Sequence, residues 1–322
     1  MIIFIQKYKD KSMGEEWNKL EKAIDSLNGW AKKKTNAEKE DKKIFHYLGF
    51  LIHEGASIAS LYEKWVQIKR NKEITQPKQA FATYLFGQIQ QKMQSALNKL
   101  EDLSYNESSD KRALLAILLL FNMEYHIKKD IGYFQFNRFV LEQWSLEHIY
   151  AQNSKSIVAE EELKNLDEKK KVAIEKWLAE VIEHLKRNHT EDEALEKEIS
   201  KFLKKIPSLE NIAKDLEKLG LLPLLKRIDE AFLRDGELHL LQNLTLLDKS
   251  SNGALGNLIF SKKQEKIRDL DDQQKLIPIC TREVFRKEFS KQERRNLHIF
   301  TKEDQEDYLC TLKKYLEEYK TE

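Results

Sequence analysis

The chain has 322 residues, 41% of them hydrophobic, which is enough for a sizeable core in one large or two to three small domains. A charged content of 34% with only 4 prolines is typical of a mostly helical protein with long solvated faces. Lys and Arg number 56 against 54 Asp and Glu, so net charge does not indicate nucleic-acid binding, and a DNA site would require a local basic patch.

The cysteines and the apolar runs favour a soluble, cytoplasmic protein. Cys280 and Cys310 lie far apart in the sequence and form neither a disulfide framework nor a zinc knuckle, so we expect reduced thiols. The apolar run at the N-terminus lacks the basic region and cleavage site of a signal peptide. The run from Ala113 to Phe121 is about half the length that spans a bilayer, so we expect a core helix and no membrane partner.

Residues 1–131 predict an all-helical domain. Apolar residues at helical spacing predict helices near 13–32, 44–52, 57–70, 77–100 and 114–125. Pro77 is suited to the first turn of the fourth helix, and the polar stretch 106–110 separates the last two. His46 and His53 lie in this apolar helical context, so we expect them in the core or at its boundary.

Residues 132–322 predict a second domain of mixed structure. The pattern predicts strands at 143–149 and 238–247, a small-polar loop at 248–253, and helices at 255–270, 284–289 and 304–319. Between the strands, a highly charged helical block at about 155–235 has the character of an insertion with solvated faces.

The polar residues of the two strands and the helix after them match the parts that a one-metal phosphodiesterase needs. Such a site needs a base that activates water, a hard cation on the phosphate and a group that orients the base. His148 is the candidate base, and Glu147 beside it is the candidate metal ligand. Asn243 in the second strand, Asn252 in the loop and Asn257 at the helix start complete the set. Each is common in structural positions, so only the ordered combination carries this prediction.

Basic residues near this set are candidates for DNA contact. Lys262, Lys263 and Lys266 lie on the predicted helix, and the first and last of them share a face that could touch phosphates. Arg282 and Arg286 belong to the densest basic stretch nearby. The competing interpretation is that at least half of such charges only keep a surface solvated.

The segments 144–153 and 241–263 resemble the two halves of the HNH (His-Me finger) motif. The sequences of these segments resemble the C-terminal nuclease domain of GmrSD-like modification-dependent (type IV) restriction endonucleases. Residues 277–285 and 300–304 are similar to the end of that domain. The resemblance implies a mainly α fold: a helical connecting domain at 1–131, then a ββα-metal nuclease core at 132–322 with a helical insertion at about 155–235 and C-terminal helices.

The resemblance also implies an activity and partners. These are a DNA endonuclease of a bacterial restriction and antiviral system, Mg²⁺ or Mn²⁺ as cofactor, DNA (modified phage DNA included) as substrate, and a ParB-like nucleotide-binding domain or subunit as partner. The implied roles are His148 as base, Asn243 orienting His148 or the phosphate, Glu147 and Asn252 as metal ligands with Asn257 competing for the second place, and Lys263 supporting the phosphate or the loop.

Three departures leave alternatives open. Ala151 stands where many HNH sequences have proline, and 95 residues separate His148 from Asn243 (243 − 148 = 95). No Asp-Gly-Gln-Gln-Arg motif of a ParB-like domain is present. One alternative is a degenerate HNH module that acts as a DNA- or partner-binding scaffold, and another is an RNA-cleaving toxin. His239 is a weaker candidate for lining the cleft, since such a histidine more often caps or packs.

Overall fold

The computed structural model describes residues 13–31, 39–150, 172, 174–176, 178–179, 181–182, 193–206, 220–221, 223–224, 227–228, 238–256, 258, 260–295 and 299–320. In this part the protein is mainly helical, as the sequence predicted, and its only strands are β1 (Trp144–His148) and β2 (Leu244–Asp248). Two compact units form: 1–100 with 116–141 and 315–322, and 101–115 with 142–314.

The boundary between the units near this point lies between residues 141 and 142, not between 131 and 132 as expected. Residues 132–141 belong to the first unit, where Phe134 and Phe139 are buried. The backbone N–H of Phe134 donates to Nε2 of His46 at 3.1 Å, and the ring of Phe139 contacts His53 at a centroid distance of 5.0 Å. Apolar burial therefore ties this aromatic segment to the helices before it.

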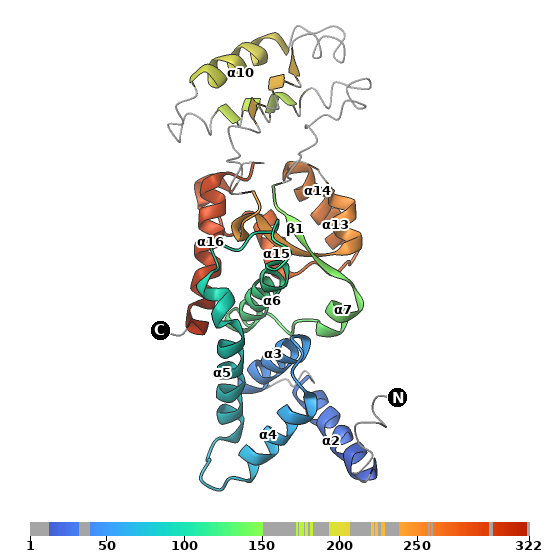
Figure 1. Cartoon of the computed structure of the whole chain (residues 1–322). Helices are drawn as coiled ribbons and strands as arrows, with labels where there is room; N and C mark the ends of the chain where they lie inside the picture. Colours follow the sequence, from blue (N-terminus) through green and yellow to red (C-terminus); the bar gives the residue numbers. More distant parts are fainter. Residues whose placement is uncertain are drawn as a thin grey trace. The chain divides into compact units, whose positions relative to one another are not determined.

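The first unit is a helical assembly (Figure 1). Its elements are α2 (Met13–Ala31), α3 (Lys39–His53), α4 (Ile58–Arg70), α5 (Pro77–Asn98), the later part of α6 (Lys111–Lys128), α7 (Phe136–Leu141) and η4 (Glu317–Tyr319). Pro77 occupies the first turn of α5, and the Ser57 side chain caps α4 by accepting from the N–H of Ser60. None of the described helices has the length and apolarity to cross a membrane.

In the second unit β1 and β2 pair in antiparallel orientation, with Glu147 opposite Thr245 and His148 opposite Leu244. All five residues of β2 are buried. The strand predicted at 238–247 is shorter than expected, because Leu241–Asn243 form the 3-10 turn η2 immediately before β2. This turn places Asn243 at the entrance to β2, beside the end of β1.

Two helices follow β2: α13 (Lys249–Leu255) and α14 (Phe260–Asp272). Figure 1 shows both beside β1, and α13 packs against both strands. The loop expected at 248–253 is therefore a helix. The Asp248 carboxylate caps it by accepting from the N–H groups of Ser250 and Ser251, both at 3.0 Å. Gly256, at φ 47°, ends it by donating its N–H to the Asn252 carbonyl.

The remaining described elements of the second unit are α10 (Glu193–Lys205), α15 (Ile279–Phe285), η3 (Gln292–Arg294) and most of α16 (Lys302–Leu316). Within the expected insertion, Ile174, Leu178 and Val181 are buried with residues of α10, which confirms the predicted apolar stripe at these positions. Val172 is 58% exposed and lies outside that stripe. Trp177 and Leu185, also expected there, are outside the described residues.

Candidate active site at the end of strand β1

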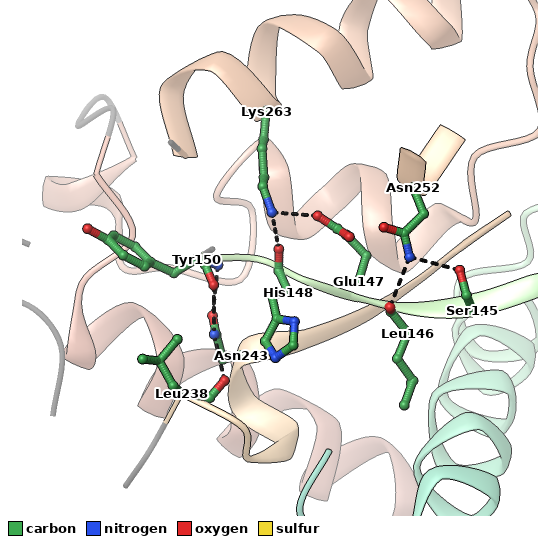
Figure 2. Close-up of polar contacts among 9 residues, drawn as sticks. All are labelled: Ser145, Leu146, Glu147, His148, Tyr150, Leu238, Asn243, Asn252 and Lys263. Carbon is green, nitrogen blue, oxygen red and sulfur yellow. Dashed lines mark hydrogen bonds and ion pairs between the residues drawn. The ribbon is translucent and has the colours of Figure 1, made fainter. Parts of the chain in front are cut away.

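Glu147 and His148 point to opposite faces of β1. Alternation along a strand sends neighbouring side chains to opposite sides, and the strand continues through His148. Figure 2 shows the Glu147 carboxylate on the side of Lys263 and Asn252, with the His148 ring across the strand from them. The two residues that the sequence predicted to share one site therefore occupy two different environments.

The face of Glu147 holds a buried ion pair. Nζ of Lys263, on α14, lies 2.5 Å from Oε1 of Glu147 and donates also to the His148 carbonyl oxygen at 2.5 Å. The Lys263 and Glu147 side chains are 1% and 6% exposed. Burial raises the pKa of Glu147 and lowers that of Lys263, while their mutual attraction opposes both shifts. Lys263 thus joins the end of β1 to α14, and its burial favours a supporting role over a phosphate contact.

Asn252 lies on the same face, on α13. Its Nδ2 donates to the Ser145 hydroxyl at 2.8 Å and to the Leu146 carbonyl at 3.0 Å. Figure 2 shows its amide oxygen directed toward the Glu147 carboxylate. Asn252 and Glu147, both expected as metal ligands, are therefore brought together, although from a helix and a strand rather than from a loop and a strand.

The Glu147 carboxylate and the Asn252 amide are the candidate metal donors on this face. Carboxylate and amide oxygens are the right class for Mg²⁺ or Mn²⁺, but the carboxylate is already paired with the Lys263 ammonium. In the described ranges, no three or more His, Cys, Asp and Glu residues gather closely enough to hold a metal ion. Asn257, the competing ligand, is outside the described residues.

The face of His148 is built from rings. Nε2 of His148 lies 3.3 Å from Nδ1 of His239, and the Tyr105 and His148 rings pack in a T-shaped arrangement at a centroid distance of 4.6 Å. The Lys111 amine lies over the Tyr105 ring, 4.5 Å from its centroid. Burial, with smaller contributions from His239 and Lys263, lowers the pKa of His148 to about 4. The imidazole is therefore neutral at pH 7.

Backbone bonds fix the two partners of His148. The N–H of Tyr105 donates to the carbonyl of His239 at 2.8 Å, and Ser104 and Leu240 form an antiparallel bridge beside it. This pairing joins the segment before α6 to the segment before β2. The backbone at His239 is therefore held by this pairing, independently of the contact between the two imidazole rings.

Asn243 acts on this face through the backbone. It is fully buried; its Oδ1 accepts from the N–H of Tyr150 at 2.8 Å, and its Nδ2 donates to the carbonyls of Tyr150 at 3.0 Å and Leu238 at 2.9 Å. Its own carbonyl accepts from the N–H of Ile149 at 2.9 Å. Asn243 thus holds the chain just after His148 and just before His239.

The residues expected to bind phosphate differ in their exposure and in their ion pairs. Lys262 is exposed and pairs with Glu265 at 2.8 Å, and Lys266 is partly exposed. Arg282 and Arg286 both contact Asp271 at 3.5 Å. One carboxylate thus offsets part of the charge of the two arginines, and the basic stretch is weaker than the sequence indicated.

The sequence did not predict that Tyr105, Lys111 and His239 would gather around His148. His239 was only a weaker candidate, and Tyr105 and Lys111 flank the polar stretch at 106–110, which matches no catalytic or binding motif. The contact between His148 and His239 joins residues 91 positions apart. Only the proximity of His239 to Asn243 in the sequence pointed toward it.

Comparisons with protein-family models, with curated proteins and with solved structures each find no match. Any function assigned to this site therefore rests on the residues, their geometry and the motif resemblance.

Proposed function

We propose that this chain is a nuclease that hydrolyses phosphodiester bonds in DNA, with His148 as the general base. The observation that carries the proposal is the position of the neutral His148 ring at the end of β1. Lys263 holds the backbone at His148, and Asn243 holds the two residues that follow it. In this proposal β1, β2 and the helices α13 and α14 are the ββα core that the resemblance implies.

The chemistry assigned to His148 is the removal of a proton from an attacking water. An imidazole whose pKa is about 4 is unprotonated at neutral pH, so it can accept that proton without first losing one. The exposed amine of Lys262 and that of Lys266 on α14 are the proposed contacts to the phosphate backbone. Dependence on Mg²⁺ or Mn²⁺ stays a prediction, and we assign no step to a metal.

The biological setting follows from the motif resemblance. We propose a nuclease component of a bacterial restriction system that acts on phage DNA, with a ParB-like nucleotide-binding domain or subunit as its partner. Co-purification with such a subunit, followed by comparison of modified and unmodified DNA as substrates, tests this setting separately from the chemistry.

A plasmid cleavage assay tests the nuclease activity. Wild type and His148→Ala are incubated with supercoiled DNA in EDTA, Mg²⁺ or Mn²⁺. We expect His148→Ala to reduce cleavage by about 100- to 10,000-fold, the range that general-base catalysis contributes. DNA binding should be unchanged. His53→Ala is the matched control, because it removes a histidine of the first unit that belongs to none of these contacts. Undiminished cleavage by His148→Ala would contradict the proposal.

One observation favours a second function, a degenerate HNH module that binds DNA or a partner without cutting. The Lys263 ammonium already neutralises the Glu147 carboxylate, which the resemblance assigns to the metal. This alternative predicts DNA binding without cleavage under every metal condition. An RNA substrate in the same assay separates the third reading, an RNA-cleaving toxin, which would cut RNA and spare DNA.

A further inference from the structure

The pairing of His148 with His239 determines which nitrogen of His148 is available for chemistry. A neutral imidazole carries one N–H, and its two ring nitrogens exchange the roles of donor and acceptor between tautomers. Nε2 of His148 faces Nδ1 of His239 at 3.3 Å. One hydrogen lies between these nitrogens, so the tautomers of the two rings are coupled.

Two arrangements satisfy this contact, and they differ in their consequence. If Nδ1 of His239 donates, the lone pair on Nε2 of His148 is consumed and Nδ1 of His148 carries the hydrogen. If Nε2 of His148 donates, its Nδ1 keeps the lone pair. Within the described part of the chain no hydrogen bond reaches Nδ1 of His148, so only the second arrangement leaves a ring lone pair that is not used in a hydrogen bond.

We infer that His239 is a positioning residue, which accepts a hydrogen bond from Nε2–H of His148 and keeps Nδ1 of His148 as the base. This inference rests on the proposed role of His148 as a base. The Tyr105 ring packs against the same imidazole at an interplanar angle of 69° and restricts its rotation. Nothing in the motif resemblance assigns a role to His239 or Tyr105.

The fold holds His239 rigidly enough for this role. Its carbonyl accepts from the N–H of Tyr105, and the carbonyl of the preceding residue, Leu238, accepts from the Asn243 side chain. Asn243 also bonds to Tyr150, two residues after His148. The buried side-chain amide of Asn243 thus holds the backbone next to both imidazoles, at Tyr150 and at Leu238.

Nitrogen NMR of the whole chain with ¹⁵N-labelled histidine tests the inference without any need for activity. The chain has 8 histidines, and the signals of His148 are assigned by their loss in His148→Gln. At pH 7.5 we expect the wild-type His148 to show a protonated Nε2 and an unprotonated Nδ1. A protonated Nδ1 in the wild type overturns the inference at once.

Two substitutions at His239 extend the test. His239→Leu fills similar space and cannot accept, so the nitrogen shifts of His148 should move toward an average of two tautomers. Cleavage should fall by about 10- to 100-fold, as is typical when the group that orients a histidine is lost. His239→Asn places an amide oxygen near the position of Nδ1, so it should restore both the wild-type shifts and most of the cleavage.

The outcomes separate the inference from the proposed function. Shifts of His148 that are unchanged in His239→Leu overturn the inference, even if cleavage falls. A wild type that cuts nothing but shows the Nε2–H tautomer contradicts the proposed function and supports the inference about His239. If His239→Leu does not fold, the wild-type tautomer and His239→Asn still decide the question.

Discussion

Two histidines, the buried His46 in the first unit and the partly buried His148 in the second, are bonded in different ways. In the first unit Nδ1 of His46 contacts the Lys42 carbonyl at 2.7 Å, and its Nε2 accepts from the N–H of Phe134 at 3.1 Å. A carbonyl only accepts and an amide N–H only donates, so the tautomer of His46 is fixed and both nitrogens are occupied. In the second unit, among the described residues, the His148 side chain has one hydrogen-bond contact, between its Nε2 and Nδ1 of His239 at 3.3 Å.

The difference separates a structural histidine from one that is available for chemistry. Burial lowers the pKa of both, to about 3 for His46 and about 4 for His148, so a lowered pKa does not distinguish them. What distinguishes them is the use of the second nitrogen. Both ring nitrogens of His46 are hydrogen-bonded to the backbone, whereas Nδ1 of His148 has no hydrogen bond in the described residues. The backbone beside His148 is held by Lys263 and Asn243.

The largest expected effect on stability comes from breaking the support beneath His148. Lys263→Met keeps most of the side-chain volume and leaves the buried Glu147 carboxylate without its partner. Removing one member of a buried pair costs about 3 to 5 kcal/mol, so the free energy of unfolding in urea should fall by that amount.

A double variant provides the control. Glu147→Gln with Lys263→Met removes both charges and should recover at least half of the lost free energy. Lys262→Met is the neighbouring exposed control on α14, for which we expect a change below about 0.5 kcal/mol. Equal effects of Lys263→Met and Lys262→Met would show that the pair does not support the end of β1.

A smaller effect is expected from acid acting on His46. Its pKa is about 3 in the folded protein and 6.5 in the unfolded chain, so the folded state resists protonation. The stability that this neutral histidine contributes is complete above pH 6.5 and is lost as the pH falls from 6.5 toward 3. At pH 5 the loss is about 2 kcal/mol, from about 1.4 kcal/mol for each pH unit.

The measurement compares wild type with His46→Gln between pH 7.5 and pH 5. Other titrating groups cancel in the difference between the two proteins, which should shrink by about 2 kcal/mol over this interval. A difference that stays constant across the interval would mean that His46 does not resist protonation in the folded state.

Much of the fold could be predicted because it depends on local patterns. Apolar spacing predicted most helices of the first unit, Pro77 marked the start of α5, and the sequence near His148 predicted β1. The helix α13 was missed because its seven residues, small and polar, have no apolar period. The Asp248 cap makes this segment a helix, and a lone Asp before Ser residues also fits a turn.

The candidate site could be predicted only in part. The sequence identified His148, Glu147, Asn243 and Asn252, and the structure brings them all to the β1–β2 pair. It could not show that Glu147 faces Lys263, 116 residues away, or that His148 faces His239. The opposite faces of Glu147 and His148 follow from strand alternation, but the partner on each face depends on long-range packing, which no local spacing encodes.

The smallest stability effect is expected at an exposed cation, in contrast to the buried Lys263. Arg286 is 56% exposed and contacts Asp271 and Glu283 at 3.5 and 3.9 Å, so Arg286→Ala should change the free energy of unfolding by less than about 0.5 kcal/mol.

The same variant tests whether Arg286 contacts DNA phosphate. If it does, a plot of the logarithm of the DNA-binding constant against the logarithm of salt concentration should be less steep for Arg286→Ala than for wild type, with the slope reduced by about 1. Arg70→Ala, at an exposed position in the first unit, is the matched control and should leave the slope unchanged. Identical slopes for wild type and Arg286→Ala would show that Arg286 does not contact DNA. The basic stretch would then be interpreted as solubilising surface charge.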